Sequence, residues 1–363
     1  MKNTLIIPAS GKSSRFPNMK PKWLLTHPDG ELMIEKVLSS FNFDEYENVF
    51  LTILQHHEDK YSIVKTISQI YDTKISVCLL PNPTESAVET VYQTIMKNNI
   101  KGFITIKDAD CYVKANFQSN RNFVCGMVID SDSKVEKIQN KSFINKNDND
   151  VISDIQEKNI ISNTICVGVY SIAVNLFLDA FKAIKQSPSY GFDNELYISH
   201  IISYLIYNKN NFDFIPALEF IDWGSLKEWR SEQKKYKTFF FDIDGVLVKN
   251  VPKHGSKNWF NSLEIIKNNM KVLKKLSLSG HQIIFTTSRS SSGVSLFKNF
   301  LQEQGIKYKQ IITDCYHSQR VIINDFASTN PYPSCIAINI PRNQELQIFL
   351  DAVLEESRVE LAL

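Results

Sequence analysis

Apolar residues stand in short unbroken runs along the first part of the chain, and segments with helical spacing separate several of these runs. Five runs are typical of buried strands: TLIIPAS (4–10), NVFLTIL (48–54), KISVCLL (74–80), GFITIKDAD (102–110) and NFVCGMVI (122–129). Apolar positions recur at helical spacing in ELMIEKVLSSF (31–41) and ESAVETVYQTIMKNN (85–99). This alternation predicts an α/β fold with a largely parallel sheet, helices on both faces, and ligands at the carboxyl ends of the strands.

The same pattern begins again two-thirds of the way along the chain, at KKYKTFFFDIDGVLVKN (234–250). An unbroken apolar strand there leads into two carboxylates. Two later runs, QIIFTTSR (282–289) and RVIINDF (320–326), are expected to be strands that end at Thr287 and Asp325. A chain of 363 residues also exceeds the usual size of one domain. We therefore predict two doubly wound α/β domains, residues 1–230 and 238–363, joined by the charged linker 231–237.

Composition and charge limit the kinds of molecule that this protein is expected to bind. Hydrophobic residues make up 43% of the chain and charged residues 22%, which are ordinary values for a globular protein. Lys and Arg (41) nearly balance Asp and Glu (39), so no global field attracts nucleic acid or an acidic membrane surface. The sequence offers no signal-peptide core or membrane span, and its six scattered cysteines include no CxxC pair. We expect a cytoplasmic protein that acts on small substrates; a homo-oligomer stays open.

The loop after the first predicted strand carries groups that suit a polyphosphate. Gly11, Ser13 and Ser14 offer backbone N–H groups and hydroxyls to phosphate oxygens, and Arg15 and Lys22 add positive charge. The spacing is neither that of a Walker A loop nor that of a GxGxxG dinucleotide turn. Because such a loop in isolation is more often ordinary surface, its assignment depends on the segments that follow it.

Those segments resemble, in order, blocks of the sugar-phosphate nucleotidyltransferase family: PASGKSSRF, PKWLL, LMIEKVL, KDADCYV, NELYISHII and IDWGSLKEW. The resemblance implies that Arg15 and Lys22 neutralise the triphosphate while a substrate phosphate attacks its α-phosphorus. It also implies that Asp110 and Asp222 bind Mg²⁺, with Asp108 as an assisting carboxylate. The remaining implied site residues are the nucleotide-binding Pro8, Ala9, Ser10, Gly11, Ser13, Ser14 and Ser86, and the substrate-binding Glu195.

The resemblance favours CTP as the nucleotide, because PASGKSSRF and KDADCYV look closest to cytidylyl-transferring relatives, while UTP and GTP stay open. The acceptor that it implies is a sugar or polyol phosphate. Lys12 and Ser10 depart from the family pattern and leave the contact to the base open. A helix cap alone would explain Ser86, and a capping or solvent-facing role would explain Glu195. Adjacent His56 and His57 have no partner cluster in the sequence, so we expect them at the surface.

The second domain resembles the haloacid dehalogenase-like phosphatase superfamily over residues 236–345, through KTFFFDIDGVL, QIIFTTSR and RVIINDF. The resemblance implies that Asp242 attacks phosphorus, Asp244 protonates the leaving oxygen, and Thr287 holds a phosphate oxygen. It implies a Mg²⁺ site at Asp242, Asp244 and Asp325. Arg320, with Lys309 as the second candidate, would supply the cation that relatives take from a lysine, and Asn324 is a second departure. The spacing of the motifs leaves no room for a substantial cap domain.

Together these features predict a bifunctional enzyme. The first domain would be a Mg²⁺-dependent nucleotidyltransferase, and the second would hydrolyse phosphate monoesters in the same pathway, as in the synthesis of capsule or surface polysaccharide precursors. Two alternatives stay open. The second domain could be a non-catalytic scaffold, or the first could be a glycosyltransferase, since those enzymes also use a DxD-like metal motif within a doubly wound sheet.

Overall fold

The computed structural model describes residues 3–11, 16, 19–117, 120–130, 138–187, 195–325 and 334–351. The chain divides into two compact units, Met1–Ser231 and Glu232–Leu363. Within the described ranges, no helix is both long and apolar enough to span a bilayer.

The first unit is built on a mixed sheet. Its main path has the order β10-β6-β9-β4-β1-β2-β3. Strands β1 to β4 run parallel to one another, whereas β9 is antiparallel to β4 and β6, which flank it on the main path. The hairpin of β7 and β8 extends the sheet beside β9. The bounds are β1 (Asn3–Pro8), β2 (Asn48–Leu54), β3 (Ser76–Leu80), β4 (Phe103–Lys107), β6 (Phe123–Val128), β7 (Ser142–Lys146), β8 (Ile152–Glu157), β9 (Thr164–Ala173) and β10 (Asp213–Pro216).

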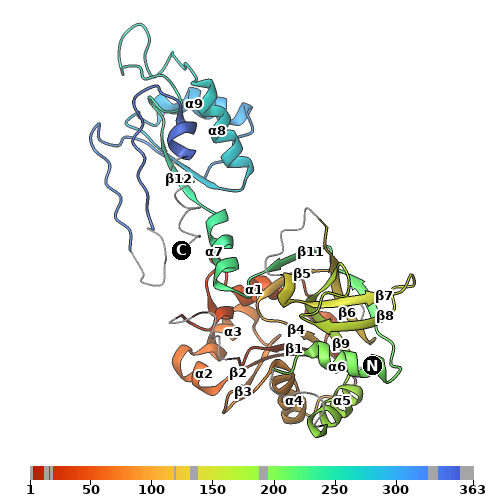
Figure 1. Cartoon of the computed structure of the whole chain (residues 1–363). Helices are drawn as coiled ribbons and strands as arrows, with labels where there is room; N and C mark the ends of the chain where they lie inside the picture. Colours follow the sequence, from red (N-terminus) through yellow and green to blue (C-terminus); the bar gives the residue numbers. More distant parts are fainter. Residues whose placement is uncertain are drawn as a thin grey trace. The chain divides into compact units, whose positions relative to one another are not determined.

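Helices cover both faces of this sheet, because successive side chains of a buried strand point to opposite sides. On β1, Leu5 and Ile7 join one core cluster and Ile6 joins the other. The Ile6 face packs against α4 (Ala87–Asn98), α5 (Val174–Gln186) and α6 (Ile198–Tyr207), and Figure 1 shows α4 and α5 below the sheet. The other face packs against η1 (Lys22–Leu24), α1 (Met33–Leu38) and α3 (Ile63–Tyr71).

Short elements complete the first unit. They are η2 (Phe43–Glu45), α2 (Gln55–Tyr61), η3 (Ile138–Asn140) and the antiparallel pair of β5 (Cys111–Lys114) and β11 (Glu219–Asp222). Residues 231–235 of the expected linker belong to α7 (Leu226–Lys235). On α2, His57 is buried, which contradicts the expectation of a surface site, while His56 is exposed.

The second unit has a three-stranded parallel sheet in the order β12-β13-β14, formed by β12 (Thr238–Asp242), β13 (Gln282–Thr286) and β14 (Gln310–Ile312). Its other described elements are α8 (Lys267–Leu278), η4 (Ser292–Val294) and α9 (Ser295–Glu303). Phe241, Phe285 and Leu273 lie in its core cluster.

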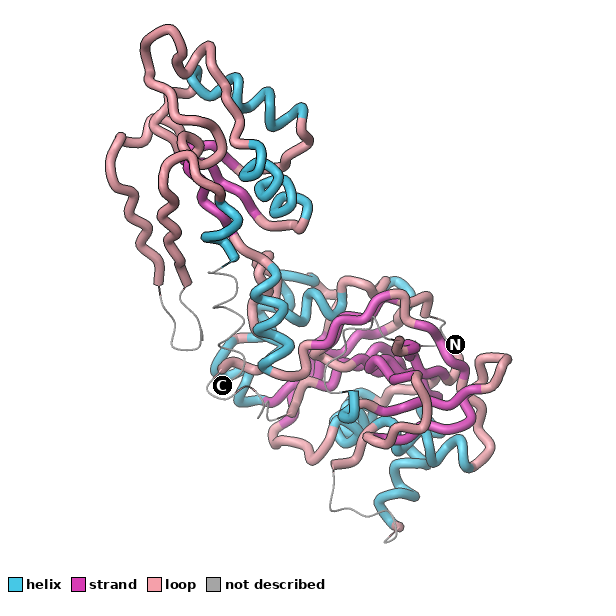
Figure 2. The backbone as a smooth tube through the Cα atoms, turned by 45° about the horizontal axis from the view of Figure 1, so that its top comes forward, coloured by secondary structure: helices cyan, strands magenta, loops and turns pink. Residues whose placement is uncertain are grey.

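One expected strand of the second unit is absent. Residues 321–325 form no strand and are drawn as loop in Figure 2. Val321 is 74% exposed and Ile323 is 93% exposed, so these apolar side chains find no core in this conformation. The prediction of a strand that ends at Asp325 is therefore wrong for this structure.

Candidate active site

Two carboxylates of the first unit meet because β5 pairs with β11. Asp222 is the last residue of β11 and lies opposite Cys111, the first residue of β5, so Asp110 is its near neighbour. The Trp223 N–H donates to the Asp110 carbonyl at 2.9 Å and fixes this arrangement. A Cβ added at Gly224 would stand 3.1 Å from Asp222 Oδ1 and 3.2 Å from Asp110 Oδ2. Both carboxylates therefore border the same small space.

Each of these carboxylates is paired with a lysine. Lys22, in the turn of η1, donates to Asp110, and Lys141 donates to Asp222. Burial alone would raise the pKa of Asp110, but the ammonium groups of Lys22, Lys141 and Lys107 together outweigh burial and lower it. Burial alone would lower the pKa of Lys141, but the Asp222 carboxylate raises it above its ordinary value. The described structure thus holds two ion pairs side by side.

A fully buried lysine shapes the turn that carries Asp108 and Asp110. Lys107 Nζ donates to the carbonyls of Asp108 and Cys111, each at 2.8 Å, and lies 3.0 Å from Cys111 Sγ. Burial and the neighbouring Asp110 carboxylate raise the pKa of Asp108. Gly168, at φ +76°, leaves room for Asp108, since a Cβ there would come within 2.6 Å of Asp108 Oδ2.

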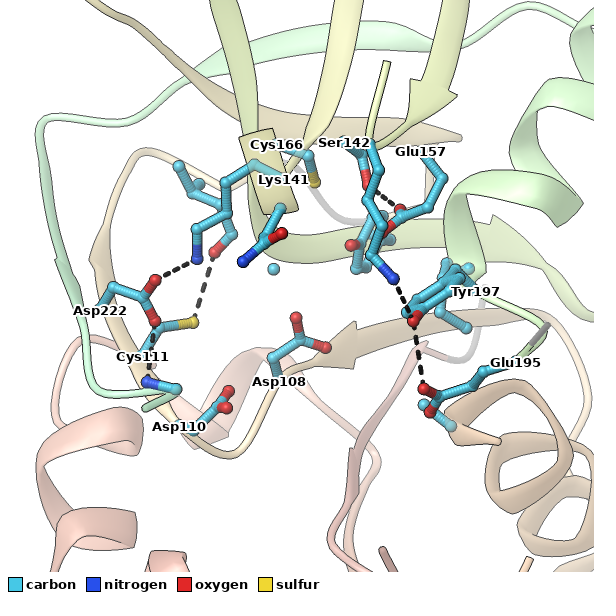
Figure 3. A pocket seen from close by; sticks show the side chains of 18 of the residues that line it. Asp108, Asp110, Cys111, Lys141, Ser142, Glu157, Cys166, Glu195, Tyr197 and Asp222 are labelled. Atoms are coloured by element: carbon cyan, nitrogen blue, oxygen red, sulfur yellow. Dashed lines mark hydrogen bonds and ion pairs between the residues drawn. The ribbon is translucent and has the colours of Figure 1, made fainter. Parts of the chain in front are cut away.

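These carboxylates line a cavity of about 360 Å³, shown in Figure 3. On its far side, Glu157 accepts hydrogen bonds from Ser142 and, at 2.7 Å, from Ser199. Lys158 Nζ donates to Tyr197 Oη at 2.6 Å, and Tyr197 donates to Glu195 Oε2 at 3.2 Å. The polar lining residues include Asp108, Asp110, Lys141, Ser142, Glu157, Lys158, Glu195, Tyr197, Asp222 and Glu228.

The loop after β1 is only partly described. Pro8 ends the strand, Ala9 donates to the Thr52 carbonyl at 2.8 Å, and Gly11 is exposed. Ser10 is fully buried, and its hydroxyl lies 2.6 Å from Thr90 Oγ1 and 3.1 Å from Thr84 Oγ1. The structure thus places the Ser10 hydroxyl against the start of α4. Three expected phosphate ligands, Ser13, Ser14 and Arg15, lie outside the described residues.

Ser86 caps α4, because its hydroxyl accepts the Glu89 N–H at 3.2 Å. It is buried, at 7% exposure. The capping role that the sequence offered for this residue is therefore present, independently of any nucleotide.

No cluster of three or more His, Cys, Asp or Glu side chains that could hold a metal ion occurs in the described part of the chain. Mg²⁺ nevertheless needs few protein ligands, because it keeps several waters and is often bound by one or two carboxylates together with substrate phosphates. Asp110 and Asp222 supply two carboxylates, and Gly224 keeps the space beside them open. The residues present fit such an ion.

A second group of polar residues lies at the carboxyl ends of β12 and β13. Thr287 Oγ1 donates to Asp244 Oδ2 at 3.3 Å, and Arg320 Nη2 stands 3.6 Å from Asp242 Oδ1. Burial raises the pKa of Asp242, which Arg320 opposes. Asp325 is exposed, and within the described ranges no hydrogen bond or ion pair joins it to either of the other two carboxylates. The structure thus brings four of the five expected residues together.

The sequence did not indicate several residues of these sites. Arg289, fully buried, donates from Nη2 and Nε to both Asp244 oxygens at 2.6 to 3.1 Å. In the first unit, the sequence patterns also did not indicate four residues of the cavity region: Lys107, Lys141, Glu157 and Lys158. The serine-arginine pair after Thr287 was a visible signal for Arg289, whereas Lys141 follows a polar segment with no motif of its own.

No protein-family model and no curated protein matches this sequence. Solved structures match its fold. A nucleoside-diphosphate-sugar pyrophosphorylase from Vibrio cholerae RC9 has a TM-score of 0.55 and 21% identity, covering 63% of this chain and 99% of its own. An inositol-1-phosphate CTP transferase from T. maritima has a TM-score of 0.50 and 14% identity, covering 64% and 96%. At these identities the likeness establishes a shared Rossmann-like fold for the first unit, and not an activity.

Proposed function

We propose that residues 1–230 transfer a nucleotidyl group from a nucleoside triphosphate to a phosphate monoester and release pyrophosphate. The observation that carries this proposal is the pairing of Asp110 with Lys22 and of Asp222 with Lys141 at one cavity. Phosphoryl-group transfer depends mainly on positioning and charge neutralisation, which such a set of charges provides. The fold shared with a pyrophosphorylase and a CTP transferase supports the same reaction.

In this reaction an oxygen of the acceptor phosphate bonds to the α-phosphorus, and the bond from that phosphorus to the bridging oxygen breaks. Lys22, together with Arg15, would neutralise the triphosphate, and the loop from Pro8 to Ser14 would bind the nucleotide. Asp110 and Asp222 would hold Mg²⁺, whose contribution is charge neutralisation of the phosphates. Glu195 would contact the acceptor from the far side of the cavity, where it meets Tyr197.

We favour CTP as the donor and a sugar or polyol phosphate as the acceptor, within the synthesis of capsule or surface polysaccharide precursors in the cytoplasm. The likeness to a transferase that uses CTP and inositol 1-phosphate supports this choice. The polar lining around Glu157 and Tyr197 suits an acceptor with several hydroxyl groups.

The test is a screen of four nucleoside triphosphates against a panel of sugar and polyol phosphates, with pyrophosphate release measured. Lys22→Ala should lose about a hundredfold in rate, because a preorganised charge of this kind contributes on the order of 3 kcal/mol. Lys20→Ala, an exposed lysine two residues earlier, is the matched control and should behave as the wild type. Transfer of a sugar from a nucleotide sugar, without pyrophosphate release, would instead favour the glycosyltransferase alternative.

For the second unit we propose hydrolysis of a phosphate monoester through an aspartyl-phosphate intermediate. Asp242 would attack phosphorus, Thr287 would hold a phosphate oxygen, and Asp244 would protonate the leaving oxygen. The proximity of these three side chains at the ends of adjacent parallel strands supports the proposal. Arg320, beside Asp242, would neutralise the phosphate. Asp242 and Asp325 would supply carboxylates to a Mg²⁺ site, to which Asp244 would contribute through its main chain, because its side chain serves as the acid.

Release of phosphate from p-nitrophenyl phosphate tests this second activity. The wild type should release phosphate, and Asp242→Asn should not, because the substitution removes the nucleophile while leaving the size of the side chain unchanged. Equal rates for the two proteins, or none in the wild type, would favour a non-catalytic scaffold.

A further inference from the structure

Arg289 is a fully buried arginine beside the candidate site of the second unit, and an arginine is almost never fully buried unless its charge is paired. Its partner is Asp244, whose side chain is 16% exposed. Nη2 and Nε donate to Asp244 Oδ1 at 2.6 and 3.1 Å, and Nε also lies 2.9 Å from Oδ2. A two-pronged pair of this kind fixes the direction of the carboxylate as well as its position.

Burial keeps Arg289 away from a substrate, so it differs from the other arginine of this site. The Arg320 side chain is 37% exposed, and its Nη2 stands beside Asp242, where a bound phosphate would need a cation. The Arg289 side chain is 1% exposed, and its backbone N–H donates to Thr287 Oγ1 at 3.0 Å. Arg289 can therefore influence a reaction only through the groups that it holds.

The guanidinium group of Arg289 also holds a surface loop, residues 249–264. The two ends of this loop are joined, because the Lys249 N–H donates to the Glu264 carbonyl at 2.8 Å. Between them, the Trp259 carbonyl accepts a hydrogen bond from Arg289 Nη1 at 3.4 Å. One buried side chain thus contacts the 249–264 loop on one side and Asp244 on the other.

We propose that Arg289 is a positioning residue that holds the Asp244 side chain in place for the leaving oxygen and ties it to the 249–264 loop. This assignment rests on the proposed hydrolysis of a phosphate monoester and deepens it. Proton transfer to the leaving oxygen matters most for an alkyl phosphate, whose alkoxide is a poor leaving group. It matters least for p-nitrophenyl phosphate, because nitrophenolate departs readily without a proton. Arg289 should therefore be needed chiefly for alkyl esters, the class to which polyol phosphates belong.

The first experiment compares glycerol phosphate with p-nitrophenyl phosphate in the full-length protein. The measured quantity is kcat/KM, which covers the reaction up to departure of the leaving group. Arg289→Lys keeps the charge but loses the planar fork. We expect kcat/KM to fall by about tenfold or more for glycerol phosphate and by about threefold or less for p-nitrophenyl phosphate, because general-acid catalysis contributes roughly 10²- to 10⁴-fold where the leaving oxygen needs a proton.

Arg121→Lys is the substitution control for this comparison. Arg121 is an exposed arginine of the first unit that pairs with Asp213, so both esters should react as in the wild type. Equal losses for the two esters in a folded Arg289→Lys protein would indicate a purely structural arginine and overturn the proposal.

The second experiment follows amide hydrogen exchange by mass spectrometry and needs no turnover. In Arg289→Lys, and also in Asp244→Asn, the amides of the 249–264 loop should exchange about tenfold faster or more, because the contacts that hold the loop are weakened. The strands of the first unit should keep their wild-type rates. Unchanged exchange of the loop in both variants would overturn the tie between Asp244, Arg289 and the loop.

A change within the loop tests the same tie from its other end. Trp259→Phe removes the hydrogen bond of 2.9 Å from the indole Nε1 to the Val251 carbonyl, and should speed exchange of the loop and lower kcat/KM for glycerol phosphate. Phe260→Leu, at the next residue and 48% exposed, is the matched control and should do neither. Phosphate release from neither ester by the wild type would reject the proposed hydrolysis, and the exchange rates would then decide the role of Arg289 by themselves.

Discussion

At the scale of single residues, Gly224 has a role that a side chain would disturb. A Cβ at this position would lie 3.1 Å from Asp222 Oδ1 and 3.2 Å from Asp110 Oδ2, closer than most real contacts of a Cβ atom. The space that the missing side chain leaves is the space in which the two carboxylates would share a cation. The two carboxylate charges are therefore not sufficient for this site; the room between them matters as well.

We expect Gly224→Ala to raise the Mg²⁺ concentration needed for half-maximal pyrophosphate release by about tenfold or more, the range seen when residues that orient metal ligands are changed. The cause is displacement of one carboxylate by the new methyl group. Calorimetric titration of Mg²⁺ would check the same change without turnover. An unaltered Mg²⁺ requirement in the alanine variant would argue against the carboxylate pair as the metal site.

His57 offers a second prediction at this scale. Burial lowers its pKa to about 4, and the charges of His56 and Lys60 act in the same direction. Its Nδ1 is buried without a hydrogen-bond partner in the described structure. The unfolded chain, with an ordinary pKa of about 6.5, binds a proton over the range in which the folded protein does not.

Folding stability should therefore fall as the pH is lowered from about 6.5 toward 4, and His57 should contribute to that loss. We expect His57→Gln to show a smaller drop in Tm over this interval than the wild type. His254→Gln, at an exposed position of the second unit, is the control and should follow the wild-type curve. Parallel curves for the wild type and His57→Gln would show that the buried imidazole is not the titrating group.

At the scale of elements, the start of α4 offers a test of two roles for Ser86, as a helix cap and as a nucleotide contact. The Ser86 hydroxyl caps the helix, and the carboxylate of its partner Glu89 accepts a hydrogen bond from the Glu85 N–H at 2.6 Å. Removing such a cap costs about 1 kcal/mol. Ser86→Ala should lose this stability in urea unfolding followed by tryptophan fluorescence, and Ser86→Asp should restore it.

The same pair of variants tests nucleotide binding separately from capping. If Ser86 also contacts the nucleotide, the stable Ser86→Asp protein should need more nucleoside triphosphate for half-saturation, because it places a carboxylate near phosphates. Normal saturation in that variant would limit Ser86 to its structural role.

The spacing of apolar residues within short segments correctly predicted several strands and helices. The runs of β1 to β4 and β6 are buried strands, and α4 follows its helical spacing. The antiparallel position of β9 and the pairing of β5 with β11 depend on contacts between distant parts of the sequence, which periodicity cannot reveal. The site shows the same division: Asp110 and Asp222 could be named from motifs, whereas the lysine beside Asp222 comes from a segment without one.

For the segment RVIINDF, the run of apolar residues gave a wrong prediction of a strand. Its apolar run suits a strand, but a strand needs a partner edge, and Ile323 remains 93% exposed. Hydrophobicity alone therefore does not establish pairing.

At the scale of the whole molecule, each unit places acidic side chains where its strands end. In the first unit Asp110 lies past β4 and Asp222 ends β11; in the second, Asp242 ends β12. In α/β sheets, groups that bind ligands gather at the carboxyl ends of the strands. Each compact unit therefore holds its own candidate site, built entirely from its own residues.

This separation predicts reciprocal losses in the full-length chain. Asp222→Asn should reduce pyrophosphate release by about a hundredfold, with partial recovery at high Mg²⁺, and leave phosphate release unchanged. Asp242→Asn should abolish phosphate release and leave pyrophosphate release unchanged, because its nucleophile belongs to the other unit.

The wild type should also hydrolyse a phosphate ester of the transferase substrate or product faster than any nucleoside triphosphate, since an enzyme that destroyed its own donor would defeat the first reaction. Phosphate and pyrophosphate followed together in one assay, for both variants and the wild type, provide the measurement. Melting curves separate chemistry from folding, because a structural aspartate would lower Tm while the rate stayed normal. Loss of both activities in one stable variant, or faster hydrolysis of triphosphates than of every ester, would contradict two independent sites serving one pathway.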